Sequence, residues 1–105
     1  MQKKHTKATP MNALKILDRI TGDDPALRAL IEEETLHAHV ARMIYEARTQ
    51  AGLTQQELAR LVGTKQPVIA RLEDADYNGH SLSMLQRIAT ALHQRLEVHL
   101  VPDAQ

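Results

Sequence analysis

Six histidines are the residues of this chain whose type could bind a metal ion or transfer a proton. His37 and His39 lie two positions apart in a predicted helix, so their side chains point to different sides and cannot hold one ion together. The other four fall in separate predicted elements, without the His-x3-His spacing of a helical zinc site: His5, His80, His93 and His99. Ser81 and Ser83 have no companion base, and the chain has no cysteine and no glycine-rich phosphate loop. We therefore expect no enzyme, no metal site and no cofactor.

The composition is typical of one soluble domain built from packed helices. The 105 residues are 43% hydrophobic and 25% charged and include no Phe or Trp, so the core must consist of Leu, Ile, Val, Ala and Met. The absence of Cys fits a reducing compartment, and no apolar stretch approaches the roughly 18 residues of a membrane span. No apolar run follows the lysines near the N-terminus. These features predict a cytoplasmic protein without membrane contact.

The net charge is zero, but the charges are distributed unevenly. Residues 23–36 are strongly acidic, and residues 37–73 are the only basic segment that we expect to fold. Nucleic-acid binders are usually basic. Any contact with nucleic acid is therefore expected within 37–73, with modest affinity that falls as salt rises.

Capping signals divide the N-terminal part into a tail and two helical stretches. Residues 1–10 indicate a flexible tail, and a first helix is expected over 12–20. Asp24 and Pro25 mark the start of a second helical stretch, because an N-cap side chain precedes a proline at the first helical position. That stretch runs to Gln50.

Two apolar sets on the stretch 25–50 point in different directions. Leu27, Leu30 and Ile31 lie roughly 145° around the helix from the second set, which consists of Leu36, Val40, Met43, Ile44 and Ala47. Either the helix breaks near Glu32–Glu34, or its first half faces a different partner from its second half. That partner is the 12–20 helix of the same chain or another protein.

Three short helices are predicted after residue 53. Thr54 and Glu57 have the spacing of a capping box at the start of the first helix. Gly63 ends this helix, Thr64 is expected to cap the next one, and Ser81 is expected to cap the last.

Residues 95–101 change to the two-residue period of a β-strand. Leu96, Val98 and Leu100 alternate with polar residues, and Pro102 ends the pattern. A lone strand has no ladder partner, so we expect the same strand of a second chain to pair with it antiparallel about a two-fold axis. The other interpretation is a short solvated tail.

Residues 55–73, QQELARLVGTKQPVIARLE, resemble the helix-turn-helix of Cro/C1-type repressors, the XRE family. Ala59 is small where the second helix crosses, and Gly63 suits the positive φ of the tight turn. The wedge between the two helices is filled by Leu58, Val62, Ile69 and Leu72. The resemblance covers about residues 40–94 and implies an all-α, lambda-repressor-like bundle of about five core helices. Extra N-terminal helices and one short C-terminal β-strand complete the expected fold, with the helix-turn-helix domain at 37–94.

The resemblance implies that the second helix of the motif, about 65–73, lies in the major groove of double-stranded DNA. Gln66 would pair with adenine, and Lys65 or Arg71 would donate to guanine. Val68 would pack on a thymine methyl group.

Further residues are expected to support this reading helix. The resemblance places Gln55 at a phosphate, and Asn78 and His80 in the following loop are expected to contact the DNA backbone as well. Arg48 and Glu73 match a structural salt bridge of phage repressors, so we assign them to stability and not to DNA.

The chain as a whole resembles the antitoxins of HigBA-type toxin–antitoxin modules, through its ending ALHQRLEVHLVP and its acidic helical segment starting at Asp-Pro. Such proteins repress their own operon and neutralise an mRNA-cleaving toxin of the RelE type. This implies a homodimer on a palindromic operator, with residues 95–101 for dimerisation and 11–36 for the toxin. The toxin-binding candidates are Leu27, Leu30, Ile31, Glu32, Glu33 and Glu34, because an acidic surface suits a basic toxin. Two alternatives stay open: a stand-alone XRE-family regulator, and a protein-binding module without DNA affinity.

Overall fold

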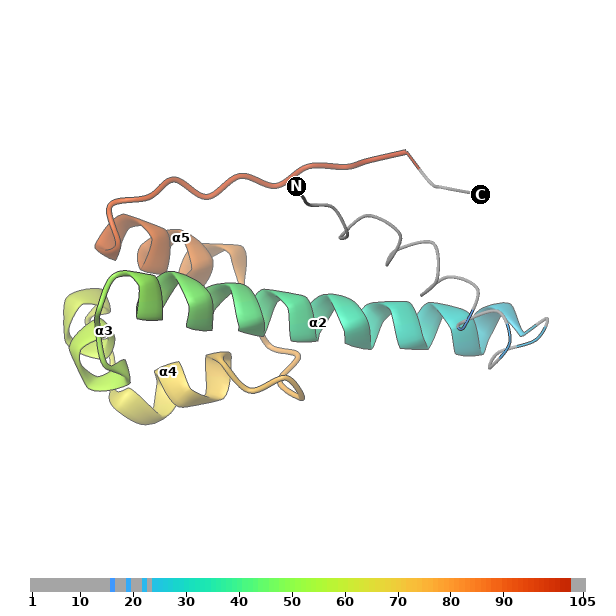
Figure 1. The fold of residues 1–105 in the computed structure, drawn as a ribbon, viewed down its shortest axis with the longest axis horizontal. Coiled ribbons are helices and arrows are strands. Elements are labelled where there is room, and N and C mark those ends of the chain that lie inside the picture. The colour runs from blue at the N-terminus through green and yellow to red at the C-terminus, as the bar shows by residue number, and fades with distance from the viewer. Residues whose placement is uncertain (1–15, 17–18, 20–21, 23, 103–105) are drawn as a thin grey trace, which may run out of the picture. The chain divides into compact units, whose positions relative to one another are not determined.

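The computed structural model describes residues 16, 19, 22 and 24–102 of the chain. This part forms the helices α2 (Pro25–Gln50), α3 (Gln55–Val62), α4 (Gln66–Leu72) and α5 (Leu82–Ala91) (Figure 1). The chain divides into two compact units, Met1–Thr35 and Leu36–Gln105, and α2 contributes residues to both. None of the described helices is long and apolar enough to cross a membrane. The predicted tail at 1–10 and most of the predicted helix at 12–20 lie outside the described residues.

Helix α2 begins at Pro25, as the sequence predicts. Oδ1 of Asp24 accepts hydrogen bonds from the backbone N–H groups of Ala26 and Leu27, each at 3.1 Å, and Pro25 fills the first position, where no N–H is needed. The helix then runs without interruption to Gln50. The interpretation that it breaks near Glu32–Glu34 is therefore wrong, and the two apolar sets point to different sides of one continuous helix.

The core of the second unit is made of aliphatic side chains from all four helices. Ile44 of α2, Leu58 of α3 and Ile69 of α4 are at most 2% exposed, and Ile88 of α5 is 4% exposed. Ala59 is also buried, at the side of α3 that packs on α4. The predicted wedge is confirmed, since all its members are buried: Leu58, Val62, Ile69 and Leu72. Burial of each large aliphatic side chain stabilises the fold by about 1.5–3 kcal/mol.

After α5 the described chain continues neither as a helix nor as a strand. His93 adopts a left-handed conformation with φ 58°, and the N–H groups of His93 and Gln94 donate to the carbonyls of Thr90 and Ala89 at 3.0 and 2.7 Å. This hydrogen-bonding pattern ends α5. Residues 94–102 then run on as an extended segment (Figure 1).

The described residues confirm the all-helical part of the predicted fold class but do not support its helix count or its C-terminal strand. The core has four helices instead of about five, because the chain leaves the helical conformation at His93 and no further helix follows up to residue 102. The strand predicted at 95–101 does not form within one chain. A β-ladder requires a neighbouring strand, and the described part of the chain supplies none.

Candidate nucleic-acid interface

Helix α3 and the turn that follows it are fixed by local hydrogen bonds. The hydroxyl of Thr54 accepts from the N–H of Glu57 at 3.0 Å, and Oε1 of Glu57 accepts from the N–H of Thr54 at 2.8 Å, which confirms the predicted capping box. The backbone N–H of Thr54, and then its hydroxyl, hold the pKa of Glu57 below its ordinary value. At the other end Gly63 has φ 87°, and its N–H donates to the carbonyl of Ala59 at 2.9 Å. The chain thereby leaves α3 in a tight, left-handed turn.

Helix α4 begins at Gln66, and its N-cap residue lies one position after the predicted one. Lys65, and not Thr64, is the N-cap residue, and no side chain forms a capping hydrogen bond there. The prediction of a Thr64 cap is wrong. Pro67 lies in the first turn of α4, where its missing N–H costs nothing. Lys65 and Gln66 are both exposed at this end of the helix.

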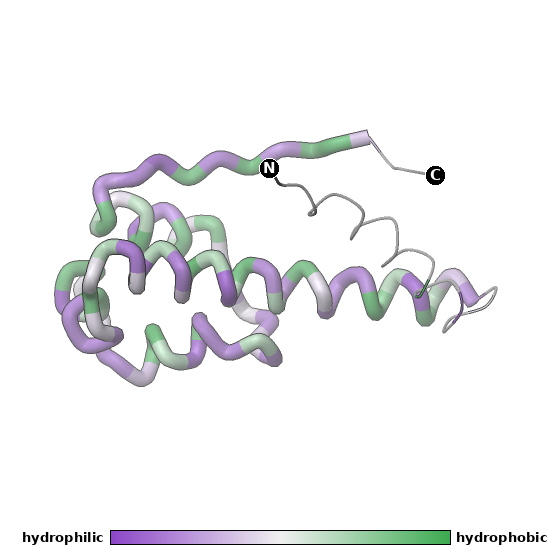
Figure 2. The backbone as a smooth tube through the Cα atoms, viewed as in Figure 1, coloured by the Kyte–Doolittle hydropathy of each residue, from purple (hydrophilic) through white to green (hydrophobic). Residues whose placement is uncertain are grey.

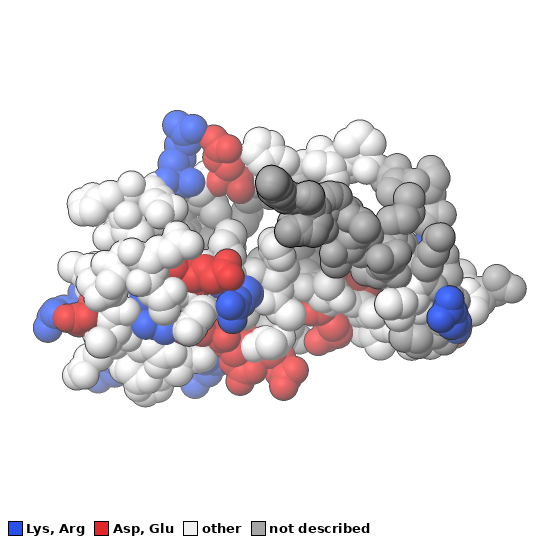
Figure 3. All heavy atoms as spheres, in the orientation of Figure 1, with Lys and Arg blue, Asp and Glu red and all other residues white. Residues whose placement is uncertain are grey.

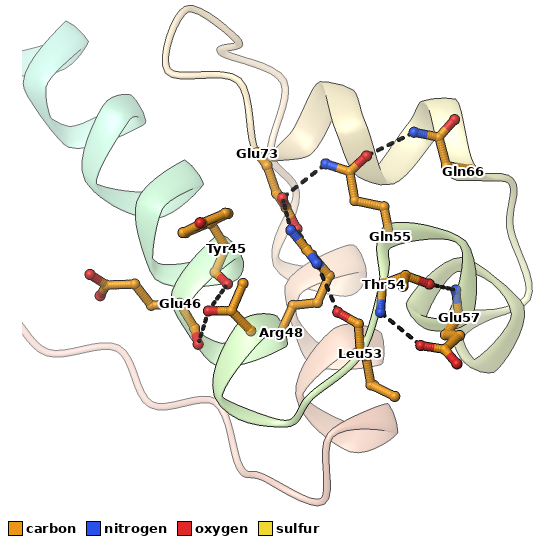
Figure 4. A network of polar contacts seen from close by, with 10 residues as sticks. Tyr45, Glu46, Arg48, Leu53, Thr54, Gln55, Glu57, Gln66 and Glu73 are labelled. Atoms are coloured by element: carbon orange, nitrogen blue, oxygen red, sulfur yellow. Dashed lines mark hydrogen bonds and ion pairs between the residues drawn. The ribbon is translucent and has the colours of Figure 1, made fainter.

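A chain of polar contacts joins α2, α3 and the end of α4 (Figure 4). Nε and Nη2 of Arg48 donate to the two carboxylate oxygens of Glu73 at 2.7 and 3.0 Å. Nη1 of Arg48 donates to the carbonyl of Leu53 at 2.8 Å. The side chains of Arg48 and Glu73 are only 10% and 4% exposed, and the hydrogen bond to Glu73 raises the pKa of Arg48 above its ordinary value. The two residues assigned to stability therefore form a forked, buried ion pair.

Gln55 extends this chain of contacts to the start of α4. Its Nε2 donates to Oε1 of Glu73 at 3.0 Å, and its Oε1 accepts from Nε2 of Gln66 at 2.7 Å (Figure 4). An ionised carboxylate can only accept, so the amide nitrogen of Gln55 faces Glu73 and its oxygen faces Gln66. The hydrogen bond with Gln55 thus orients the exposed side-chain amide of Gln66. Sequence reasoning missed this contact because the two glutamines are 11 positions apart and meet only through the packing of α3 on α4.

The outer side of α4 is defined by the buried positions on its inner side. Ile69 and Leu72 face the core, so helical geometry places Gln66 and Arg71 on the outer side, with Pro67 and Ala70 between them. Pro67 and Ala70 are outer positions of α4 that the sequence reasoning did not name, although the helical period could have indicated them.

Val68 and the surrounding charges complete the description of α4. Val68 is half-buried and packs against the core of the second unit, so it lies nearer the inner side than its predicted contact with thymine requires. Lys65 and Arg71 are exposed. On the face drawn in Figure 3, cationic and acidic side chains are interspersed.

Comparison with known proteins identifies the motif. Residues 44–98, just over half of the chain, match the HTH_3 family model, described as Helix-turn-helix. The chain belongs to the helix-turn-helix family. An uncharacterized HTH-type transcriptional regulator of Haemophilus influenzae is 34% identical over 59 residues, which are 56% of this chain and 60% of that protein. Another, from Archaeoglobus fulgidus, is 41% identical over 54 residues, 51% of this chain and 76% of that protein.

The chain thus spans less than two thirds of the Haemophilus relative. No solved structure matches the chain. The family assignment therefore rests on the matched segment, which contains the end of α2 and all of α3, α4 and α5.

The loop that follows the helix-turn-helix is held by its own contacts. Nε2 of His80 lies 2.7 Å from the carbonyl of Leu72, and the His80 ring packs edge-on against Tyr77 with the ring centroids 5.1 Å apart. Because a carbonyl only accepts, Nε2 carries the proton. Nδ1 of His80 is buried, so neither ring nitrogen is available for the predicted contact with a DNA backbone. Asn78 remains exposed in the loop.

Residues predicted to bind a toxin lie on α2, before the helix-turn-helix. Leu27 and Leu30 are 39% and 52% exposed, and Ile31 is half-buried. Helical spacing places Glu34 on the same side of α2 as these three apolar residues, whereas the exposed Glu32 and Glu33 lie to either side of them. The six candidates therefore do not share one face of the helix.

The residues predicted for dimerisation are near the C-terminal end of the described chain. The dimerisation candidates Leu96, Val98 and Leu100 lie in the extended segment after α5. Among the residues that the structure describes, no three His, Asp or Glu side chains gather as a metal site.

Proposed function

We propose that the chain is a sequence-specific DNA-binding transcriptional repressor whose helix α4 enters the major groove. Membership of the helix-turn-helix family supports contact with DNA. The single observation that supports specific reading is the hydrogen bond from Gln66 to Gln55. A glutamine reads adenine by donating to N7 and accepting from the N6 amine. Gln55 uses only one hydrogen of Nε2 of Gln66, so the second hydrogen and the oxygen remain for adenine.

Other side chains on the outer side of α4 complete the proposed reading surface. The exposed guanidinium of Arg71 can donate its fork to O6 and N7 of guanine, and Lys65 can donate to the same atoms from the start of the helix. Pro67 and Ala70 are small, so α4 can approach the base edges closely, and Ala70 is suited to contact a thymine methyl group. Ala70 replaces Val68 in this role.

Contacts to phosphate are proposed on both sides of α4. Gln55 begins α3, and the N–H groups at the start of a helix favour an anion. Asn78 is exposed in the loop after α4 and can donate its side-chain amide to a second phosphate. These phosphate contacts fix the position of the protein on the duplex, whereas the contacts between α4 and the base edges select the DNA sequence.

Binding to the DNA upstream of the chain's own gene tests this proposal. Fluorescence anisotropy should show tighter binding to that duplex than to a scrambled duplex of the same composition. The affinity should fall between about 50 mM and about 200 mM salt, because phosphate contacts release counterions. Absence of binding at low salt would contradict the proposal and favour a protein-binding module without DNA affinity.

We further propose that the protein is the antitoxin of a HigBA/RelE-type module and binds its mRNA-cleaving toxin through the first turns of α2. The resemblance of the whole chain supports this role, as do the exposed Leu27 and Leu30 beside the acidic Glu32–Glu34. An apolar stripe with acidic neighbours suits a basic, RNA-binding enzyme. The second candidate is a stand-alone XRE-family regulator, in which these residues only complete the protein's own fold.

Co-expression with the neighbouring reading frame separates these two candidates. For an antitoxin, a tag on this chain should retain a small basic protein in a complex of defined mass, and co-expression should relieve the growth arrest that the small protein causes alone. DNA binding without any complex would instead support the stand-alone regulator.

A two-fold operator requires two copies of α4, so we propose a homodimer paired through residues 95–101. The half-sites would lie about one helical turn of DNA apart. Deleting residues 95–105 should weaken both self-association in analytical ultracentrifugation and operator binding. An unchanged dimer after this deletion would contradict pairing through the C-terminal segment.

A further inference from the structure

The segment after α5 has one apolar and one charged side. Figure 2 shows hydrophobic and hydrophilic residues alternating along it. Leu96 is half-buried, whereas Val98 and Leu100, on the same side, are 68% and 100% exposed. A single chain therefore covers only the first residue of the apolar side.

Leu96 lines a groove between α2 and α5. This groove has a volume of about 290 Å³, and its walls include Met43 and Ala47 of α2, Leu85 of α5, and Leu92 directly after α5. Met43 is 40% exposed. Leu96 thus lies beside apolar helix surface that one chain leaves partly uncovered.

The charged side carries its own contacts. Nη2 of Arg95 lies 2.7 Å from Oε2 of Glu97, and Nε2 of His99 lies 3.2 Å from Oε1 of Glu97. Hydrogen bonds from Arg95, and then from His99, hold the pKa of Glu97 below its ordinary value. Glu97 is therefore an anion at neutral pH. Its two hydrogen-bond donors, Arg95 and His99, lie two residues before it and two residues after it.

Two-fold symmetry restricts how two such segments can pair. Residues directly opposite each other in an antiparallel pair place their side chains on the same face of the sheet. Between identical chains, opposite residues must then both be even-numbered or both be odd-numbered. The two-fold axis consequently passes between one residue and its own copy, and only a few centres are possible within 95–101.

We propose that the pair is centred on Val98; this inference depends on the homodimer proposed above. Val98 then lies opposite the partner's Val98, and Leu96 lies opposite the partner's Leu100. On the charged side, Glu97 lies opposite the partner's His99, and this contact occurs twice. Apolar residues thus meet apolar residues, and the acidic residue meets a hydrogen-bond donor.

The neighbouring registers are less favourable. A pair centred on Glu97 sets two carboxylates directly opposite each other and places Leu100 opposite the partner's Gln94. A pair centred on His99 places Leu96 opposite the partner's Pro102, which has no N–H for the ladder. Either register loses at least one apolar pair that the Val98 register provides.

The Val98 register also covers Leu100, the most exposed apolar side chain of the segment. Because Leu100 lies opposite the partner's Leu96, it is placed beside the groove that Leu96 lines in the partner. The same contact occurs in the other direction. Each chain therefore contributes one leucine to the groove wall of the other, and the apolar surfaces of α2 and α5 become part of the interface.

Cysteine crosslinking tests the register, because the full chain has no native cysteine. Directly opposite residues have Cα atoms about 4.5–5.5 Å apart, within the disulfide range of about 4.4–6.8 Å, whereas residues displaced by two positions are about 7–8 Å apart. Under mild oxidation, Val98→Cys should convert most of the monomer band into a disulfide dimer. Glu97→Cys and His99→Cys should each remain largely monomeric alone and crosslink when the two variants are mixed.

The crosslinking and ultracentrifugation results test the register and the existence of the dimer separately. If the wild-type chain is dimeric in analytical ultracentrifugation but Glu97→Cys or His99→Cys alone crosslinks faster than Val98→Cys, the register is wrong and the dimer stands. A wild-type chain that is monomeric would overturn the dimer and the register together.

Two neighbouring residues provide a second test without cysteine. Leu100→Gln should raise the dimer dissociation constant roughly tenfold or more, because a polar side chain replaces an apolar one that the pair buries. Val101→Gln, on the charged side, should change it little. Equal weakening by the two variants would overturn the assignment of the two sides.

Discussion

Nε2 of Gln66, at the start of α4, donates to Oε1 of Gln55, the first residue of α3, over 2.7 Å. Gln55 is itself held by Glu73, and Glu73 by the buried Arg48. An exposed glutamine normally samples several rotamers, and restricting them costs free energy on binding. The contact with Gln55 restricts Gln66 before any ligand is present.

Replacing Gln55 with alanine should therefore weaken recognition without removing any predicted base contact. We expect roughly a tenfold loss of operator affinity, within the about 1–3 kcal/mol that a bidentate base contact contributes, and a smaller change on scrambled DNA. Fluorescence anisotropy on the two duplexes measures both. Gln56→Ala is the matched control, because Gln56 is the exposed neighbour. Equal losses for the two variants would show that the contact with Gln66 is irrelevant to recognition.

The proposed DNA and toxin surfaces should be separable by substitution. The double variant Gln66→Ala, Arg71→Ala should lose operator binding and still relieve toxin-induced growth arrest. The double variant Leu27→Lys, Leu30→Lys should keep operator binding and lose toxin binding, because cations replace exposed leucines in an apolar stripe. Loss of neutralisation by the first variant, with its helical content unchanged, would refute this division.

Removal of Glu73 should strongly destabilise the second unit. Glu73→Ala leaves the Arg48 guanidinium buried without its anion, and such a loss costs about 3–5 kcal/mol, a large share of the about 5–15 kcal/mol of a typical domain. Urea unfolding followed by circular dichroism measures the difference. Glu46→Ala removes the exposed ion pair with Arg42 at 3.0 Å, which should contribute at most about 1 kcal/mol. Similar losses for both variants would contradict the importance of burial.

The left-handed residue at the end of α5 predicts a stabilising substitution. His93 has φ 58°, a conformation that costs a residue with a Cβ roughly 1 kcal/mol and costs glycine little. His93→Gly should raise the midpoint of thermal unfolding, whereas His93→Val should lower it because a β-branched side chain fits this region worst. A lower midpoint for His93→Gly would mean that the imidazole makes a contact worth more than the backbone strain.

Glu57 should give the stability a pH dependence of defined sign. Its pKa is lowered in the folded chain from the ordinary 4.5 by hydrogen bonds from Thr54, so the folded state favours the ionised form. The resulting stabilisation is fully present above pH 4.5 and is lost as the pH falls through the lower folded-state pKa. In urea unfolding, the advantage of the wild type over Glu57→Gln should therefore shrink below pH 4.5. An advantage that stays constant with pH would contradict this account.

The local features of the fold could be predicted because they depend on near neighbours in the chain. Asp24 caps α2, Thr54 and Glu57 form the capping box, and Ser81 accepts from the N–H of Met84 at 3.1 Å. Each of these contacts spans two or three residues. The apolar wedge of the helix-turn-helix could be predicted from helical spacing for the same reason. The predicted Thr64 cap was wrong because α4 starts at Gln66, so that Lys65 is its N-cap residue.

Features that depend on distant segments could not be predicted. The Gln55–Gln66 contact depends on how α3 crosses α4, which the residue types do not determine. The inner position of Val68 depends on the rotation of α4 against the core. His80 was expected at the surface, but its ring forms a hydrogen bond with the carbonyl of Leu72, eight residues earlier in the chain. The strand predicted at 95–101 depends on a second polypeptide, and the single chain has only an extended segment there.

The uncovered segment after α5 has a consequence for the lifetime of the protein in a cell. A lone chain exposes Leu100 completely to water, next to backbone that has no ladder partner in the described residues. Extended, apolar segments of this kind are what proteases take into their clefts, by adding a strand to their own sheet. The proposed homodimer covers this segment, so dilution would speed degradation and a higher concentration would slow it. The concentration of the protein would then feed back on its own turnover.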